Sequence, residues 1–356
     1  MSKVALITNI SGQDGSYLAE LLLKKGYTVH GIIPHNPVLN NKSVSDDLHA
    51  GHPEFHIHHF DHTEISNPGR LLALIRPDEI YNLDITSGTV THATLPGAGI
   101  SALRMLEAIR SQGLEHTTRY YHASSSALYG LVNGMSINDM VTLNVPSANR
   151  VAQISDFWTA VNYRETFGMF ACNGILFNHE SPRRSESFVT RKITRGLANI
   201  TQGLEKCLYL GNLNALRDWG HARDYVKMQW LMLQQEKPED FVIATGIQFT
   251  VRQFVTFAAL ELGIKLRFVG KGIEEKGVIA AIISPVAAAL KVGDVIVEVD
   301  PRYIRPAEVS KASVNPSKAR RQLGWAPETS LQDLVIEMVQ ADLAFAKKAA
   351  RLKLYG

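Results

Sequence analysis

Cysteine is scarce in this sequence, and long apolar runs are absent from it. The 356 residues include two cysteines, Cys172 and Cys207, which favours reduced buried thiols over a disulfide framework or a cysteine-based metal site. No apolar stretch reaches the ~18 residues of a membrane-spanning helix, and the N-terminus leads into a strand pattern without the features of a secretory signal. We therefore expect a cytoplasmic protein with no membrane partner.

A strong excess of charge of one sign is also missing. The 37 Lys and Arg residues and 34 Asp and Glu residues give a formal net charge of +3, and the basic residues do not form the stripe that nucleic-acid binding requires. The sequence contains no internal repeat and no low-complexity tract. This composition is typical of a packed globular protein, and it argues against a nucleic-acid partner.

Short apolar runs alternate with amphipathic stretches through the first half of the chain, as in repeated strand–helix–strand units. After residue 176 the alternation becomes less regular, and strands are short. We therefore expect an α/β fold: a Rossmann-type doubly wound parallel sheet in residues 1–176, and a smaller C-terminal α/β substrate lobe in residues 177–356, interleaved with the core. The predicted strands are 4–8, 27–33, 55–60, 79–83, 119–123, 170–176 and 295–299, and the predicted helices 16–25, 102–111, 147–167, 189–202, 224–235, 251–262 and 330–348.

A glycine-containing segment follows the first predicted strand. Asn9-Ile-Ser-Gly12-Gln13-Asp14-Gly15 leads into a helix, as in dinucleotide-binding sites, where the first position is normally glycine. Asparagine tolerates a left-handed backbone, so we expect the turn to form while the Asn9 side chain crowds the phosphate space or hydrogen-bonds into it. A strand–turn–helix with a purely structural role remains the alternative.

Longer segments resemble one enzyme family. Residues 3–8, 12–20, 77–83, 161–165, 171–184, 188–194, 216–220, 224–230, 240–246 and 300–308 are similar to GDP-mannose 4,6-dehydratase, an extended short-chain dehydrogenase/reductase. The resemblance implies oxidation of GDP-mannose at C4 by bound NADP⁺, elimination of water across C5 and C6, and return of the hydride to C6.

The resemblance also assigns binding residues. The cofactor positions are Asn9, Gly12, Gln13, Asp14 and Asp61. The positions that hold GDP-mannose or a related GDP-sugar are Ser87, Asn178, Val189, Lys192, Arg217, Arg305 and Glu308. Arginine and lysine are natural partners of a diphosphate. The alternative is that these segments persist as packing elements.

The catalytic positions depart from the family pattern. The family's Ala-Ser-Thr-Ser-Glu-Leu-Tyr-Gly corresponds here to residues 123–130, in which Ser125 keeps the hydroxyl and Ala127 replaces the carboxylate. Asn149 and Gln153 stand at the Tyr and Lys of the family's Tyr-x-x-x-Lys, and neither carboxamide titrates near neutrality. We therefore expect a catalytically inactive or strongly impaired homologue, leaning towards a non-enzyme. It retains a GDP-sugar-binding site and acts as a regulatory or assembly partner.

That interpretation includes a homo-oligomer or a hetero-oligomer with an active dehydratase. The alternative is an active GDP-mannose 4,6-dehydratase or related lyase with a relocated base, for which His122, Tyr129 and Tyr163 are the candidates.

Further departures lie around the cofactor. Pro34 and His35 replace arginines after the second strand, Phe60 replaces a glycine before Asp61, and Asp84 replaces another glycine. These changes bring bulk and negative charge to the place where the cofactor would lie. The resemblance implies NADP as the cofactor, whereas these residues argue against its tight binding.

Five histidines lie close together in the sequence: His52, His56, His58, His59 and His62. Their strand alternation sends them to different faces, so we expect no metal site.

Overall fold

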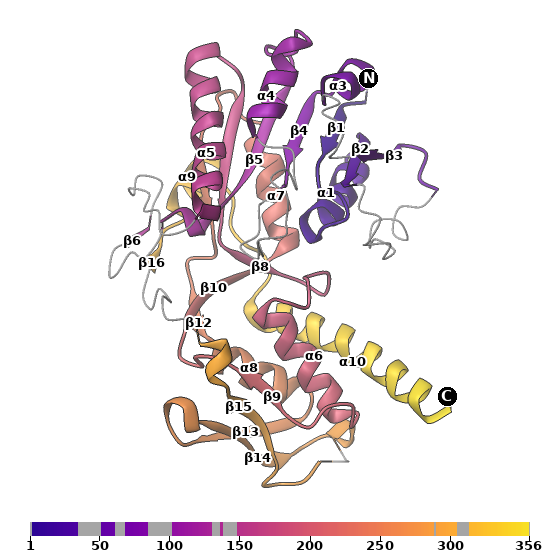
Figure 1. The fold of residues 1–356 in the computed structure, drawn as a ribbon, viewed down its shortest axis with the longest axis vertical. Helices are drawn as coiled ribbons and strands as arrows, with labels where there is room; N and C mark the ends of the chain where they lie inside the picture. Colours follow the sequence, from indigo (N-terminus) through magenta and orange to yellow (C-terminus); the bar gives the residue numbers. More distant parts are fainter. Residues whose placement is uncertain are drawn as a thin grey trace.

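The computed structural model describes residues 2–34, 51–60, 68–84, 102–129, 136–137, 148–287, 290–304 and 313–355. A seven-stranded sheet with helices on both faces forms the larger part, and a smaller α/β lobe lies at one end of it (Figure 1). Within the described residues, no helix has both the length and the apolar character needed to cross a membrane.

The large sheet is parallel at every neighbouring pair of strands. Its order is β11-β7-β5-β4-β1-β2-β3, so the chain starts in the interior of the sheet and winds outward in both directions. This confirms the predicted doubly wound α/β fold. The strands are β1 (Val4–Ile7), β2 (Thr28–Pro34), β3 (Phe55–Phe60), β4 (Glu79–Asn82), β5 (Arg119–Ser125), β7 (Ala171–Leu176) and β11 (Phe241–Ile243).

Strand alternation divides the core into two layers. Ile7, Tyr81 and Tyr121 pack against α1 (Gln13–Lys24) and α7 (Ala222–Met232) on one face. Their neighbours Leu6, Ile80 and Tyr120 pack on the other face, against α3 (Pro68–Ile75), α4 (Ala102–Ser111) and α5 (Ala148–Phe167). Continuous apolar runs in the sequence were therefore a correct indication of strands buried on both faces.

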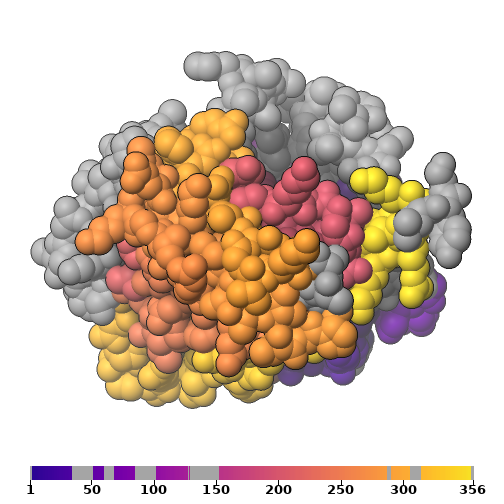
Figure 2. Space-filling model, turned by 90° about the horizontal axis from the view of Figure 1, so that it is seen from below, coloured from indigo at the N-terminus to yellow at the C-terminus, as the bar shows by residue number. Residues whose placement is uncertain are grey.

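The smaller lobe has a core of its own, with Trp219, Phe254 and Met338 among its fully buried residues. Its four-stranded sheet has the order β13-β14-β15-β9, and β14 and β15 show in orange across the lobe's outer face (Figure 2). The elements are α6 (Val189–Thr201), β9 (Leu208–Leu210), α8 (Val251–Glu261), β13 (Ile264–Val269), η2 (Gly272–Glu274), β14 (Lys276–Ile282), η3 (Pro285–Ala287), β15 (Val295–Val299), η4 (Pro301–Tyr303) and α10 (Leu331–Tyr355).

A three-stranded sheet, β12-β10-β8, lies between the two parts (Figure 1). It contains β8 (Asn178–Glu180), β10 (Leu216–His221) and β12 (Gln248–Thr250). The remaining elements are η1 (Ser126–Tyr129), β6 (Ser136–Ile137), β16 (Ser313–Val314) and α9 (Ser317–Leu323). Because α7 and β11 come from the second half of the chain yet pack into the large sheet, the chain crosses between the parts more than once. The division predicted at residues 176 and 177 stays a prediction.

Candidate active site

The carboxyl ends of the parallel strands meet at the edge of the sheet that faces the smaller lobe (Figure 1). In doubly wound folds, ligands bind at this edge, where the strand order reverses. Here the reversal lies between β1 and β4, whose ends carry Thr8 and Asn82. Thr8 Oγ1 donates to Asn82 Oδ1 at 2.9 Å, and Leu83 N donates to Thr8 Oγ1 at 2.9 Å. These bonds hold the two strand ends together at the point where a ligand is expected.

The turn between β1 and α1 forms with asparagine at its first position. Asn9 has φ of 50°, in the left-handed region that asparagine tolerates, and its carbonyl accepts from Gly12 N at 3.0 Å. A Cβ on Gly15 would lie 2.5 Å from Asn9 O and 2.7 Å from Ile10 Cα, so only glycine lets α1 approach β1 this closely. The expectation that the turn survives Asn9 is confirmed.

The Asn9 side chain folds over the turn. Its Nδ2 lies 3.0 Å from the position that a Cβ on Gly12 would take. Gly12 precedes α1 and provides no side-chain cap, so the first N–H groups of the helix are satisfied by no capping side chain. The turn thus presents a helix N-terminus beside a carboxamide donor, a combination suited to a phosphate group.

The side chains of Gln13 and Asp14 join α1 to the segment that begins with β8. His179 Nε2 lies 2.9 Å from both carboxylate oxygens of Asp14, and Gln229 Nε2 donates to Asp14 Oδ2 at 3.1 Å. Gln13 Nε2 donates to His179 O at 3.0 Å, and Ser181 Oγ donates to Gln13 Oε1 at 2.7 Å. The two side chains predicted to contact a cofactor therefore connect the sheet layer to β8.

The charge on Asp14 is stabilised inside this network. Burial raises the pKa of the Asp14 carboxyl, but the His179 ring, Arg184 and the Gln13 side chain together outweigh burial and lower that pKa below its ordinary value. The His179 ring also stacks on Tyr225 of α7, with centroids 4.7 Å apart and planes at 24°. His179 was not among the predicted site residues, and its only sequence signal was its place in a segment that resembles the family.

The catalytic positions predicted from the sequence lie on three adjoining segments. Ser125 ends β5 and is partly exposed, and Ala127 lies in the following η1. Asn149 and Gln153 lie one turn apart on α5, which packs against β5, β7 and η1. The fold therefore brings the segments that carry these four positions to the same edge of the sheet.

Of the three candidate bases, Tyr163 is engaged by a side chain of α4. It packs in the cluster between α4, α5 and the sheet, and its hydroxyl donates to Glu107 Oε1. Burial, reinforced by the Glu107 carboxylate, raises the pKa of Tyr163 to about 12, so it stays protonated near neutral pH. The Tyr129 side chain lies outside the described part of the chain. His122 is buried in β5, three residues before Ser125.

The described substrate-binding positions lie on the middle sheet and on α6 of the smaller lobe. Asn178 begins β8 and pairs with Trp219 of β10, and Val189 begins α6. Lys192 follows one turn later, with Nζ 3.2 Å from the centroid of the Tyr303 ring. Arg217 lies on β10, where its Nη1 donates to the carbonyl of Leu216 at 2.7 Å. The sequence did not indicate Tyr303, because this cation–π contact joins residues 111 positions apart.

Several predicted positions fall outside the described residues: His35, His62, Asp61, Ser87, Arg305 and Glu308. Pro34 and Phe60 end β2 and β3, and Asp84 follows β4.

Among the described residues, no group of three or more His, Cys, Asp or Glu is arranged to hold a metal ion. His30 Nδ1 and His58 Nε2 are 2.9 Å apart, and the two rings stack. The absence of a metal cofactor stays a prediction.

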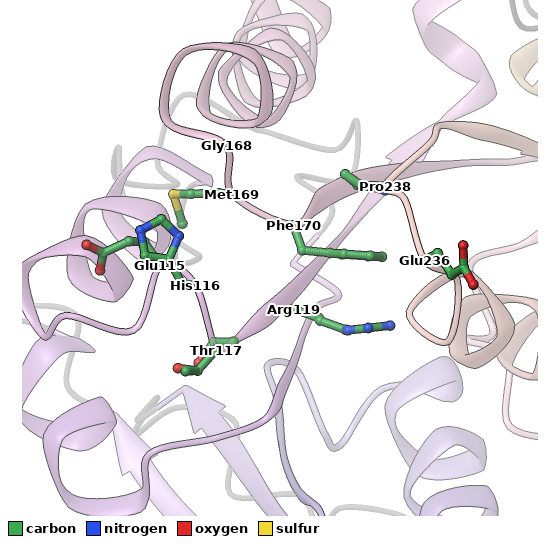
Figure 3. Close-up of a pocket in the computed structure, with 10 residues that line it drawn as sticks. Glu115, His116, Thr117, Arg119, Gly168, Met169, Phe170, Glu236 and Pro238 are labelled. Carbon is green, nitrogen blue, oxygen red and sulfur yellow. The ribbon is translucent and has the colours of Figure 1, made fainter.

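A pocket of about 270 Å³ lies at the opposite edge of the sheet (Figure 3). It is lined by residues 115–119, which lead into β5, by residues 168–170, which precede β7, and by Glu236 and Pro238. The Arg119 guanidinium lies 4.5 Å from the centroid of the Phe170 ring and donates to Leu233 O at 2.6 Å and Gln235 O at 2.8 Å. These contacts tie the end of α7 to the sheet, away from the strand ends where the predicted site residues gather.

Comparison with known proteins identifies one enzyme family. The family model of GDP-mannose 4,6 dehydratase matches residues 6–338. The chain is 55% identical to GDP-mannose 4,6-dehydratase of Vibrio cholerae, covering 100% of this chain and 98% of that one. It is 54% identical to the same enzyme of Yersinia enterocolitica, covering 99% of this chain and 97% of that one.

A solved structure shares the fold at much lower identity. The dTDP-glucose 4,6-dehydratase of Bacillus anthracis, solved in complex with NAD, superposes with a TM-score of 0.74 at 16% identity, covering 98% of this chain and 100% of that one. The comparison supports the α/β fold with a Rossmann-type parallel sheet.

The expectation of a non-enzyme is wrong. Full-length identities of 54% and 55% to GDP-mannose 4,6-dehydratases point to an active dehydratase. The argument from Ala127, Asn149 and Gln153 inferred activity from three positions, whereas the identity extends over the whole chain. With a family model over most of its length and relatives that match it from end to end, the chain belongs to the GDP-mannose 4,6-dehydratase family.

Proposed function

We propose that the protein is an active GDP-mannose 4,6-dehydratase. It oxidises the sugar at C4, eliminates water across C5 and C6, and returns the hydride to C6, which yields GDP-4-keto-6-deoxy-mannose. The observation that carries the proposal is the 55% identity to the Vibrio cholerae enzyme over the full length of both chains. The grouping of the predicted catalytic segments at the carboxyl edge of the sheet supports it.

A nicotinamide dinucleotide fits the turn between β1 and α1. The uncapped N-terminus of α1 and the Asn9 carboxamide would hold its diphosphate, and Gly15 keeps the helix close to the strand below. Bound there, the nicotinamide supplies the hydride acceptor and donor of the reaction. The complex of the Bacillus anthracis dehydratase with NAD supports this class of cofactor.

GDP-mannose is the substrate that we propose for the face between the two parts. Lys192 and Arg217 place positive charge there, and Asn178 begins the adjoining β8. Cationic side chains stabilise a diphosphate by charge-assisted hydrogen bonds. By resemblance, Arg305 and Glu308 complete this half of the site.

Proton transfer needs a group other than those at the family positions. The carboxamides at Asn149 and Gln153 take up no proton near neutral pH. The Ser125 hydroxyl, at the end of β5, can orient a sugar hydroxyl and pass a proton onward. The base is therefore proposed to lie elsewhere at the same edge.

Turnover of GDP-mannose tests the proposal directly. The purified protein is incubated with GDP-mannose and either NADP⁺ or NAD⁺, and the product is followed by mass spectrometry as the loss of one water. Arg217→Met serves as the matched variant, with the expectation of weaker GDP-mannose binding and the same product. Absence of product with GDP-mannose and cofactor both bound would contradict the proposed function.

Assembly is a separate question. The expected homo-oligomer or mixed oligomer stays a prediction, and light scattering of the purified protein measures it.

A further inference from the structure

A layer of polar side chains lies between the large sheet and α5. Asn82, His122 and Asn173 are register neighbours on the adjacent strands β4, β5 and β7. The His122 ring stacks parallel to Tyr120, which packs on the α5 side, and Asn173 Nδ2 donates to the carbonyl of Phe157 in α5 at 3.3 Å. The row therefore faces α5 near Phe157, which lies one helical turn after Gln153.

Three buried polar atoms in this layer have no hydrogen-bond partner. They are His122 Nδ1, Ser124 Oγ and Asn173 Oδ1, in residues that are at most 3% exposed. Ser124 is two residues after His122 on β5, and Asn173 is the register neighbour of His122 on β7, so the three side chains lie on the same face of the sheet. An unpartnered buried polar group costs about 1–3 kcal/mol, and a buried water with two to four polar partners removes that cost.

The His122 imidazole is uncharged in this environment. Burial lowers the pKa of His122 to about 4, and the Asp240 carboxylate opposes that shift only in part. Asp240 is itself paired with Arg164 of α5, whose Nη1 and Nη2 each donate to one carboxylate oxygen at 2.9 Å. Asp240 Oδ1 also accepts from Asn173 Nδ2 at 3.1 Å. His122 therefore has a nitrogen lone pair available near neutral pH.

Other titratable groups around the layer are engaged. Asp156 of α5 accepts from Ala102 N at 3.0 Å, and burial raises its pKa. The Tyr120 hydroxyl accepts from Asn82 Nδ2 at 3.0 Å, and burial raises its pKa far above neutrality. Among the described titratable groups facing this layer, His122 is thus the one with an unpartnered atom, and its lowered pKa means that a proton taken up there is readily released.

We propose that His122 accepts the proton that leaves the C4 hydroxyl of the substrate, through a water bound to His122 Nδ1, Ser124 Oγ and Asn173 Oδ1. This rests on the proposed dehydratase function. The residue acts through water beneath α5 and is a positioning and proton-holding residue. It lies on the strand that ends in Ser125, which gives the proton a short path from the carboxyl edge of the sheet.

The step balances. The O–H and C–H bonds at C4 break, the carbonyl forms, the electron pair of the C–H bond leaves as hydride for the nicotinamide, and an N–H bond forms at His122. Over the cycle the sugar loses protons from O4 and C5. It regains one on the hydroxyl that leaves C6 as water and one at C5 when the hydride returns to C6. His122 therefore ends the cycle neutral.

His122→Gln tests the proposal against the matched control Tyr163→Phe, which removes the other described candidate base. For the wild type we expect kcat to vary little between pH 6.5 and 9. For His122→Gln we expect kcat at pH 7 to fall roughly 10²- to 10⁴-fold and then to rise about tenfold per pH unit, because the proton must leave to solvent hydroxide. The Kd for GDP-mannose should be unchanged, and Tyr163→Phe should match the wild type.

A second readout needs no turnover. NMR of the ligand-free protein labelled with ¹⁵N-histidine should show a neutral His122 from pH 8 down to about pH 5. A charged His122 at pH 7, or a His122→Gln enzyme within threefold of wild-type kcat with the same pH profile, overturns the role of His122 and leaves the dehydratase function standing. If the wild type itself fails to turn over GDP-mannose, the proposed function and this proposal both fail.

Further variants cover the case in which His122→Gln does not fold. His122→Asn keeps a smaller amide in the layer, and Ser124→Ala removes the proposed water ligand. Both should lower kcat, Ser124→Ala by about tenfold, and wild-type kcat in both would overturn the proposal.

Discussion

Asp14→Asn tests the connection between α1 and β8. Asp14 accepts from His179 Nε2 at 2.9 Å on both oxygens, from Gln229 Nε2 at 3.1 Å and from Gln13 Nε2 at 3.2 Å. Asparagine supplies one acceptor oxygen and turns an NH₂ group toward donors, so at least one charge-assisted bond is lost and a buried donor is left unpaired. We expect the free energy of unfolding to fall by about 2–4 kcal/mol.

The pH dependence of this difference provides a second measurement. The folded-state pKa of Asp14 is lowered, so its ionisation contributes stability that is fully present above the ordinary carboxyl value of 3.8 and is lost as pH falls through the folded-state pKa. The difference between wild type and Asp14→Asn should therefore stay constant from pH 7 to pH 5 and shrink only below about pH 4.

Urea unfolding followed by circular dichroism and tryptophan fluorescence measures both effects. Glu274→Gln, which removes an exposed carboxylate, is the control and should change stability by less than about 0.5 kcal/mol. A loss below about 0.5 kcal/mol for Asp14→Asn, or a difference that grows toward acid pH, would refute the argument from the buried network.

Three further predictions follow from the geometry. Gly15→Ala should destabilise the protein by about 1–3 kcal/mol, seen as a lower Tm, because the new Cβ meets backbone atoms of Asn9 and Ile10; an unchanged Tm would contradict the close approach. Lys192→Met should raise the Kd for GDP-mannose roughly tenfold in calorimetric titration while leaving cofactor affinity unchanged, and an equal loss of both affinities would argue for a general disruption. Iodoacetamide at pH 8 should label Cys207 slowly and Cys172 only after unfolding, because burial raises the thiol pKa of Cys207 to about 11 and that of the fully buried Cys172 still further; mass spectrometry of labelled peptides would show the reverse order if this is wrong.

Local signals in the sequence were sufficient for the main architecture. Buried parallel strands appear as short apolar runs, and the intervening helices have apolar residues at helical spacing, so every strand predicted in the first half is a strand in the structure. The structure also forms β13 and β14, which were not predicted. β13 alternates apolar and charged residues from Ile264 to Phe268, and β14 is apolar after Gly277, so both carry a strand pattern that the prediction did not use.

The sequence alone determined the family, the parallel sheet and the turn that Asn9 begins, because each depends on residues that are neighbours in the chain. Only the tertiary structure decided which side chains contact one another and which are charged. Asp14 meets His179 and Gln229 across 165 and 215 positions, and His122 lies beside Asn173 because two strands pair. Burial keeps His122 uncharged, whereas the partners that the fold brings to Asp14 keep that carboxylate charged against the effect of burial. Both effects depend on the surrounding packing and leave no trace in the local sequence.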